Sequence, residues 1–299
     1  MNSGEFFVYY MMTPIALSLG FFGNIMGILV LRRKKLEKIG PVFIYRIMFI
    51  SDSIFMLQMI NPFLLNLFGK NLMTFSEFSC KVIFYLVIGM FSLTPMLLIY
   101  ISIEKLVSMK YPSKKLLTKK KWQFAFVLSM LTAGLIIFLP SFFYAGIVTI
   151  TTSSNQTSSI CVINDRFEQK IVSITNLVVR VIIAYGMMSV SSVLLIICIF
   201  RMRRRIVQNF LSNSNINQNQ IYRRDIKLAI TSLLLNFVYL ILNVPISVYF
   251  GIPNYYENKM VTAFLTYIFF YGFCINFYLL IISNKLTRKE FIKMITFKK

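Results

Sequence analysis

The chain has 299 residues, of which 57% are hydrophobic, and its 32 lysines and arginines against 10 acidic residues give a formal net charge of +22. Its mean hydropathy of +0.71 argues against a soluble domain, whose helices or strands would show regular polar faces. The sequence has no histidine, which removes histidine-based acid–base chemistry and histidine metal ligands. With no Gly-rich phosphate loop and no CxxC pair either, we expect no enzyme, no cofactor and no metal centre.

Seven apolar segments are each about long enough to cross a bilayer. The hydrocarbon core of a membrane is roughly 30 Å thick and takes about 20 apolar residues of helix to span. The predicted fold class is therefore an all-α membrane protein, a single seven-helix bundle over residues 1–299. Its spans are predicted near residues 8–31, 42–67, 80–107, 122–148, 171–200, 226–250 and 260–283. We interpret the first as a span and not as a cleaved signal peptide, because no basic residues precede it.

The basic residues predict how the bundle is oriented. Most lysines and arginines fall on alternate connections, in the ranges 32–38, 105–121, 201–227 and 285–299. By the positive-inside rule these connections are cytoplasmic, so the N-terminus is outside and the C-terminus inside. Such short basic loops beside apolar spans are suited to anionic inner-leaflet lipid, and we expect no nucleic-acid partner.

The outer connections carry features of the secretory route. Cys80 at the outer start of the third span and Cys161 in the loop after the fourth both lie in the oxidising compartment, and a disulfide between them would shape the mouth of the bundle. The same loop holds Asn155, in an Asn-Gln-Thr sequon, as a predicted glycosylation site. Cys198 and Cys274 lie within spans and are interpreted as buried free thiols.

Two segments near the inner side differ from the spans in composition. Residues 208–222 are rich in Asn, Ser and Gln and predict a flexible inner loop. Residues 285–296 alternate basic and apolar residues, and predict a short amphipathic helix on the inner leaflet. Its apolar face would hold Leu286, Phe291, Ile292 and Ile295.

Polar residues inside the spans are candidates for function, because burying them in a membrane is costly. The clearest is Asp52 in the second span, and Asn24 and Asn276 lie at comparable depth in the first and seventh. Residue types alone leave two roles open, helix packing through hydrogen bonds and an ion-binding or switch site.

Several short motifs occur at positions that match one known family. They are Gly23-Asn24, Asp52, Cys80, Ser102-Ile103-Glu104-Lys105 followed by Tyr111-Pro112, Pro245 in the sixth span, and the segment 276–280 in the seventh. In identity and joint spacing they resemble the motifs of the rhodopsin-like G-protein-coupled receptors, over nearly the whole chain.

The chain also departs from that family's pattern. Lys105 stands where the family has Arg, and a lysine lacks the planar, bidentate guanidinium. Asn243 replaces the tryptophan of the sixth span, Phe277 and Leu280 replace a proline and a tyrosine of the seventh, and the fifth span lacks its usual proline. These changes concern how the receptor would activate, and not its fold.

The resemblance implies a switch at the inner end of the bundle. Lys105 would pair with Glu104 and with Asp225, holding the third and sixth spans together until an agonist favours their separation about Pro245. The opened face would accept a heterotrimeric G protein. The alternative is that Asp225 only balances the neighbouring cations of the sixth span.

The resemblance also implies an allosteric sodium ion. Asp52 would be its anionic ligand and Thr94 and Asn276 its oxygen donors, with Asn24 and Asn243 in the same switch region. A buried, neutral Asp52 is the competing state.

The ligand is predicted from the outer half of the bundle. Phe270 occupies the position of the retinal lysine, and Val87 that of the amine-binding aspartate, so a photoreceptor and an amine receptor are disfavoured. Arg180, inside the fifth span, would pair with a ligand carboxylate or with Asp165 or Glu168. The outer half also holds a group of aromatic residues that could line a binding cavity. Together with Arg180 they suggest a receptor for a peptide or neuropeptide at the plasma membrane. They are Phe91, Tyr249, Phe250, Tyr267, Phe269 and Tyr271.

Two other functions stay open. A chemosensory receptor for small molecules has the same fold and is the nearer alternative. A transporter or channel would use Asp52 and Arg180 to line a path, but the sequence shows no internal repeat of spans.

Overall fold

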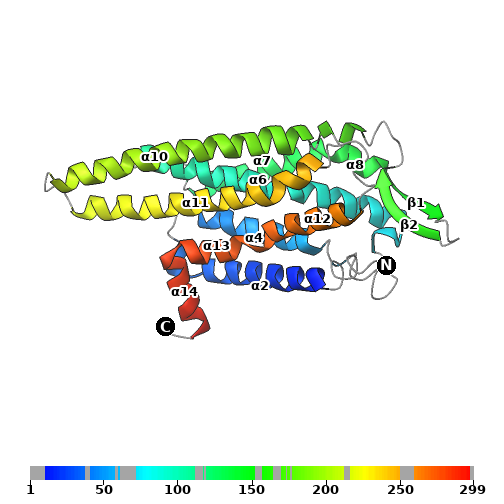
Figure 1. The fold of residues 1–299 in the computed structure, drawn as a ribbon, viewed down its shortest axis with the longest axis horizontal. Helices are drawn as coiled ribbons and strands as arrows, with labels where there is room; N and C mark the ends of the chain where they lie inside the picture. The colour runs from blue at the N-terminus through cyan, green and yellow to red at the C-terminus, as the bar shows by residue number, and fades with distance from the viewer. Residues whose placement is uncertain are drawn as a thin grey trace.

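A bundle of long helices, with a hairpin at one end and a short helix at the other, makes up the fold in a computed structural model of the chain (Figure 1). The structure describes residues 11–37, 41–57, 60, 72–111, 117, 119–151, 157–163, 170–172, 174–175, 177–211, 216–249 and 259–296. The first half of the chain forms α2 (Thr13–Leu31), α3 (Lys34–Glu37), α4 (Val42–Met56), η3 (Leu72–Thr74), α6 (Glu77–Lys110), α7 (Lys120–Ile137) and α8 (Leu139–Tyr144). The second half forms β1 (Ala145–Thr151), β2 (Thr157–Ile163), η4 (Leu177–Tyr185), α10 (Gly186–Leu211), α11 (Ile216–Tyr249), α12 (Lys259–Cys274), α13 (Asn276–Ser283) and α14 (Lys285–Ile295).

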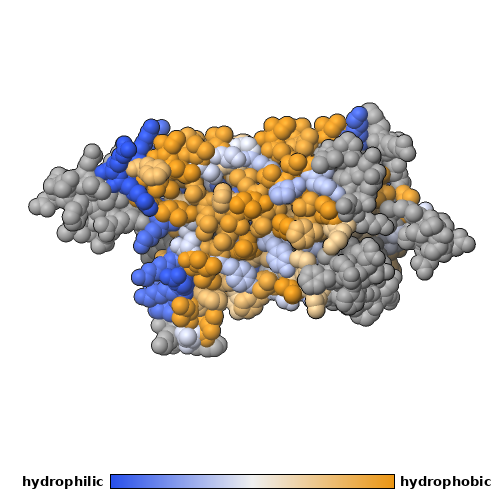
Figure 2. All heavy atoms as spheres, in the orientation of Figure 1, coloured by the Kyte–Doolittle hydropathy of each residue, from blue (hydrophilic) through white to orange (hydrophobic). Residues whose placement is uncertain are grey.

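The described helices match the predicted spans. Five are long and apolar enough to cross a membrane, and the bent pair α12 and α13 makes up to six. The second predicted span corresponds to α4, of which the structure describes 15 residues. Figure 2 shows hydrophobic residues over the middle of the bundle and hydrophilic ones at the end that carries α14, as expected for a protein whose middle faces hydrocarbon.

Helix α6 is the centre of the bundle. It packs against α4, α7, α10 and α11, and therefore contributes to every polar cluster described below. Its first turn is fixed by a reciprocal cap, in which Ser76 Oγ accepts from the Ser79 backbone N–H and Ser79 Oγ from that of Ser76, both at 3.0 Å. Pro95 lies inside the helix, which continues without a break to Lys110.

Helix α2 shows why the first span packs closely. Its outward side chains, such as Leu19 and Phe22, are exposed, while three glycines face its neighbours. A Cβ atom on Gly27 would lie 2.6 Å from the ring of Phe49 in α4, and one on Gly20 would lie 2.8 Å from Met56. Small residues thus let the backbones of two spans approach, as membrane helices often do.

The fourth span ends earlier than predicted. The sequence predicts helix to residue 148, but α8 ends at Tyr144 and Ala145–Thr151 form β1, which pairs antiparallel with β2 (Thr157–Ile163). The β-branched residues of this segment fit a strand, and an apolar run alone does not distinguish a strand from a helix.

The predicted flexible loop at 208–222 is wrong for most of its length. Helix α10 continues to Leu211 and α11 begins at Ile216, so the polar tract extends both helices beyond the membrane. Adding a turn to an existing helix costs far less than nucleating one, which is why polar residues of modest helix propensity remain helical here.

Two spans are irregular. Residues Leu177–Tyr185 of the fifth span form a π-helix, a wide form that is frequent at functional sites. The seventh span bends by 46° between α12 and α13, although it lacks the proline that is typical of this position in the family. The bend falls between Cys274, whose thiol donates to the backbone oxygen of Ala16 at 3.3 Å, and Asn276, whose amide reaches α4.

Candidate functional site

A buried polar cluster lies where α4, α6 and α13 meet. The Asp52 carboxylate accepts a hydrogen bond from Thr94 Oγ1 at 2.6 Å through one oxygen and from Asn276 Nδ2 at 2.9 Å through the other. All three side chains are buried. The structure thus brings together the three residues predicted to hold sodium, and it uses both carboxylate oxygens of Asp52.

Unpaired polar atoms occur in α4 itself and in α2, the helix packed against it. Both polar atoms of the Asn24 side chain in α2 and the Ser51 hydroxyl in α4 are buried, and they make no hydrogen bond with the part of the chain that the structure describes. Buried groups of this kind are normally satisfied by an internal water molecule or an ion. A carboxylate, two hydroxyls and amide oxygens are the donor set that a hard cation prefers, so the residues present fit the predicted ion.

An aromatic cluster links the second, sixth and seventh spans. The ring of Phe55 in α4 lies 4.3 Å from that of Phe273, 5.3 Å from Phe270 and 5.6 Å from Phe269, all in α12. Phe273 in turn meets Tyr239 of α11 edge to ring at 5.9 Å. Phe269, one of the aromatic residues predicted for the ligand site, therefore belongs to helix packing here.

Asn243 connects the sixth and seventh spans where the family has a tryptophan. Its Nδ2 donates to the Tyr239 backbone oxygen at 2.7 Å, and a Cβ on Gly272 would lie 2.8 Å from the same nitrogen. The small amide and the glycine therefore fit together. Pro245 lies two residues further on and α11 continues past it to Tyr249.

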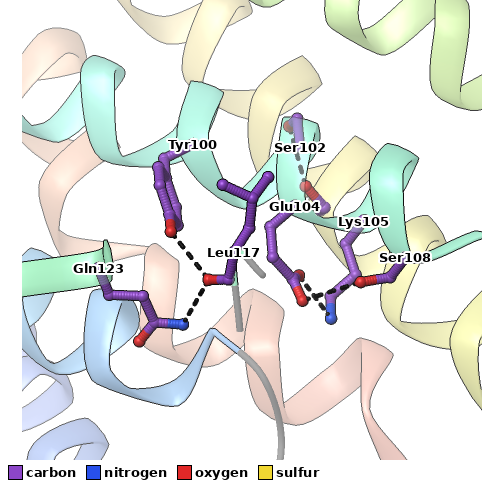
Figure 3. A network of polar contacts seen from close by, with 8 residues as sticks. Tyr100, Ser102, Glu104, Lys105, Ser108, Leu117 and Gln123 are labelled. Carbon is purple, nitrogen blue, oxygen red and sulfur yellow. Dashed lines mark hydrogen bonds and ion pairs between the residues drawn. The ribbon is translucent and has the colours of Figure 1, made fainter. Parts of the chain in front are cut away.

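The inner end of α6 holds a buried ion pair (Figure 3). Lys105 Nζ lies 2.9 Å from Glu104 Oε2, and Ser108 Oγ donates to the other carboxylate oxygen at 3.2 Å. All three residues belong to α6, so these contacts do not cross to another helix. Asp225, the third residue of the predicted lock, is half-buried on α11.

The second inner loop is anchored beside this pair. Tyr100 Oη of α6 donates to the Leu117 backbone oxygen at 2.8 Å, and Gln123 Nε2 of α7 donates to the same oxygen at 3.3 Å (Figure 3). The sequence analysis did not predict this contact, which fixes the connection between α6 and α7 next to Glu104.

The first inner connection and α14 are joined by charged residues. Arg33 Nε lies 3.4 Å from Glu290 Oε2, and Glu290 is buried although α14 is a surface helix. The first inner connection also contacts α7, because Lys120 Nζ at the start of α7 lies 3.1 Å from Glu37 Oε1. The hydrogen bond from Lys120, and then its charge, lower the pKa of Glu37 below its ordinary value.

The predicted surface helix is present as α14. Its first turn is capped by Asn284 Oδ1, which accepts from the backbone N–H groups of Leu286 and Thr287 at 3.0 and 3.3 Å. Phe291 meets Phe277 edge to ring at 5.5 Å, while Ile292 and Ile295 are exposed. The prediction that Phe291 shares an outward apolar face is therefore wrong, because its ring docks on the bundle. Ile292 and Ile295 remain exposed, and their contact with the inner leaflet stays a prediction.

At the outer end, the predicted disulfide joins Cys80 of α6 to Cys161 of β2, with 5.6 Å between their Cα atoms. It fixes the β1–β2 hairpin on the outer end of α6. Asn155, the predicted glycosylation site, lies in the hairpin connection, outside the described residues.

The predicted ligand-binding residues have different surroundings. Tyr267 is buried and its hydroxyl is hydrogen-bonded to Thr13 Oγ1 of α2. Tyr249 is half-buried at the outer end of α11, and Tyr271 is half-buried near the end of α12 that adjoins the bend of the seventh span. Phe91 lies on α6 and Arg180 on the π-helix, but their side chains are outside the description, as is the whole of Phe250.

A cavity of about 100 Å³ lies between α6, α7 and η4. Its lining is mostly apolar and includes Gly89, Met96, Gly134, Phe138 and Val179. Of the predicted ligand-binding residues whose side chains are described, none lines it.

A second buried polar cluster, not predicted from the sequence, lies nearer the inner end. It consists of Ser102 on α6, Ser192 on α10, and Ser232 and Asn236 on α11, joined by hydrogen bonds of 2.8–3.0 Å. The reasoning that selected Asp52, a polar residue in an apolar run, also applies to Asn236 and would have found it.

Comparison with known proteins gives one family match. The model described as "7 transmembrane receptor (rhodopsin family)" matches residues 23–286, a range that begins at Gly23 and contains both polar clusters. A search of curated proteins found no match.

Proposed function

The chain belongs to the rhodopsin family of seven-transmembrane receptors, and from this premise we propose that its ligand is an extracellular peptide and that it acts at the plasma membrane. The expected seven-helix membrane bundle is thereby confirmed, and the chain is a multi-pass receptor that signals from an extracellular ligand to a G protein. Its family is one of receptors and not of enzymes.

The β1–β2 hairpin is the observation that carries the peptide proposal. The disulfide from Cys161 to Cys80 fixes this hairpin on the outer end of α6. A two-stranded sheet has backbone donors and acceptors on its outer edges, which an extended peptide matches by adding a strand. The aromatic residues Tyr249 and Tyr271 and the cation Arg180 lie on helices of the same half and would take peptide side chains and a carboxylate.

A peptide-library screen in cells that express a promiscuous G protein tests this proposal. We expect a peptide agonist whose response Arg180→Ala abolishes while surface expression stays intact. Lys81→Ala is the matched control, because Lys81 is also an outer cation but lies 3.2 Å from Glu77 on its own helix. Loss of the response in both variants, or in neither, would contradict the role of Arg180.

The cavity between α6, α7 and η4 favours the chemosensory alternative. A space of about 100 Å³ with an apolar lining is too small for a peptide and suits a small apolar molecule. A response to small apolar compounds that Gly134→Leu removes, with no response to any peptide, would establish this second function. Flux or current driven by an ion gradient would instead indicate a transporter or channel.

The proposed switch combines the Glu104–Lys105 pair with Asp225. Lys105 is held by Glu104 at 2.9 Å in a buried site, and Asp225 lies on α11 at the same end of the bundle. We expect Asp225→Asn to raise nucleotide exchange by the G protein without agonist, because the variant removes an attraction between α11 and the lysine. Basal exchange equal to that of the unchanged receptor would mean that Asp225 only balances neighbouring cations.

A further inference from the structure

We propose that four residues, Ser102, Ser192, Ser232 and Asn236, hold the inner halves of α6, α10 and α11 together in the resting receptor. This inner polar cluster deepens the proposed function and rests on it. It offers a closure between helices that does not depend on the ion pair, since Lys105 pairs with Glu104 on the same helix.

The number of hydrogens on each hydroxyl and amide group determines which side chain donates in each hydrogen bond. The Ser102 hydroxyl donates to the Leu98 backbone oxygen at 2.9 Å, so its single hydrogen is used within α6. Ser232 Oγ, at 3.0 Å, must therefore donate to Ser102 Oγ, and Asn236 Nδ2 donates to the same oxygen at 2.8 Å. Ser102 thus receives two donors from α11.

The third helix joins through the second hydrogen of the asparagine amide. Asn236 Nδ2 also donates to Ser192 Oγ of α10 at 3.0 Å, and the Ser192 hydrogen is directed to the Met188 backbone oxygen at 2.8 Å. One side chain of α11 therefore bonds to two other helices at once. If α11 moved away, three donors would lose their acceptors together.

The position of the cluster makes that loss costly. Ser102, Ser232 and Asn236 have no exposed surface. On the cytoplasmic side lies an apolar layer from the same three helices, formed by Met109, Leu195, Ile199, Met202, Ile226 and Ala229. Water reaches the polar groups only when this layer opens, so separation of the inner ends and hydration of the cluster are one event.

The cluster has the strength that a reversible switch requires. A hydrogen bond between membrane helices shifts an equilibrium by about threefold on average, because competing partners exist within the membrane. Three such bonds bias the closed state by roughly tenfold to thirtyfold, which a bound agonist is able to overcome.

The test compares two adjacent serines of α10. Ser191 and Ser192 both donate to the Met188 backbone oxygen, at 2.9 and 2.8 Å, but Asn236 donates to Ser192. We expect Ser192→Ala to raise basal nucleotide exchange about threefold and Asn236→Leu roughly tenfold, whereas Ser191→Ala leaves it unchanged. Ser192→Thr keeps the hydroxyl and should restore the basal rate.

A second measurement does not require a G protein. Spin labels at the exposed positions Lys110 on α6 and Lys227 on α11, introduced as Lys110→Cys and Lys227→Cys in a Cys198→Ser background, report the distance between the inner helix ends of the full chain in nanodiscs. We expect the fraction of long distances to rise in Asn236→Leu and Ser192→Ala. Ser192→Ala removes one oxygen atom at a half-buried site, so it serves if Asn236→Leu does not fold.

The outcomes separate the two proposals. Unchanged distances in both cluster variants, or an equal change in Ser191→Ala, would overturn the inference. Longer distances in the cluster variants support it even if no G protein responds to any form of the receptor, in which case the coupling, and not the cluster, is wrong.

Discussion

Among the residues of the two polar clusters, Asp52 is the acidic one, and hydrogen-bond donors from neighbouring helices surround its side chain. Both of its carboxylate oxygens are occupied by donors from two other helices, while Asn24 on α2 and Ser51, beside Asp52 on α4, have buried polar atoms without a described partner. Buried polar atoms of this kind are normally satisfied by an internal water molecule or an ion.

We expect Asp52→Asn to abolish stabilisation of the receptor by sodium. The carboxylate is the charged ligand of the proposed ion, and an amide does not replace its charge. The measurement is the melting temperature of the purified receptor in sodium chloride against choline chloride.

Ser53→Ala is the control for that comparison, because Ser53 adjoins Asp52 but donates to the Phe49 backbone oxygen of its own helix at 2.8 Å. It should keep the sodium effect. An unchanged sodium effect in Asp52→Asn would place the ion elsewhere.

Among the glycines of the described helices, Gly27 is the one where an added Cβ would have the closest neighbour. Its missing Cβ would lie 2.6 Å from the Phe49 ring, so we expect Gly27→Ala to destabilise the receptor by about 1–3 kcal/mol despite the better helix propensity of alanine. Gly134→Ala, where the Cβ would meet nothing within 4 Å, should be neutral or slightly stabilising. Thermal unfolding of the two variants side by side decides the matter, and equal melting temperatures would contradict the close packing of α2 on α4.

At the scale of whole elements, α14 is held to the bundle by few contacts. These include the Arg33–Glu290 pair, the edge contact between Phe277 and Phe291, and the packing of Met294 against the core. A helix attached in this way is expected to unfold locally more readily than the membrane-spanning helices.

Glu290→Gln should increase amide hydrogen exchange in residues 285–295. Loss of this partly buried ion pair removes about 1 kcal/mol, or roughly fivefold in the opening equilibrium. Glu37→Gln is the matched control, because it removes an exposed pair with Lys120 and leaves α14 untouched. Equal exchange in α14 for Glu290→Gln and the unchanged receptor would show that the Arg33–Glu290 pair does not hold the helix on the bundle.

For the whole molecule, the orientation of the bundle follows from its basic residues and stays a prediction. A glycan at Asn155 would require the β1–β2 connection to be outside. We expect endoglycosidase treatment to shift the mobility of the receptor and Asn155→Gln to remove that shift, while a tag after Lys299 is protected from protease in intact cells. A glycan at Asn155 together with a protease-accessible tag would reverse the proposed topology at one end.

The sequence predicted the parts of the fold that depend on composition. Long apolar segments and alternating charge follow from the thickness and asymmetry of a membrane, and they led to the helical bundle, the surface helix and the Cys80–Cys161 disulfide. The β1 strand was predicted as helix, because apolar β-branched residues are compatible with both structures until a pairing strand is known.

The site was predictable only where one residue is unusual by itself. Asp52 is the single acidic residue of its span and draws attention, whereas Ser102 and Ser192 are ordinary residues of membrane helices. What makes them a cluster is that α6, α10 and α11 bring them within hydrogen-bond distance of Asn236, which depends on helix rotation and depth. Spacing along one helix contains no such information about its neighbours.

The disulfide between Cys80 and Cys161 holds the outer end of α6 in place, so the rest of the helix can move like a lever. The helix runs 34 residues, about 50 Å, from this fixed outer end to Lys110, and it touches four other spans on the way. With the outer end as a pivot, a tilt of a few degrees displaces the far tip by several ångströms. A small adjustment among the outer side chains is therefore magnified where the cytoplasmic machinery meets the receptor.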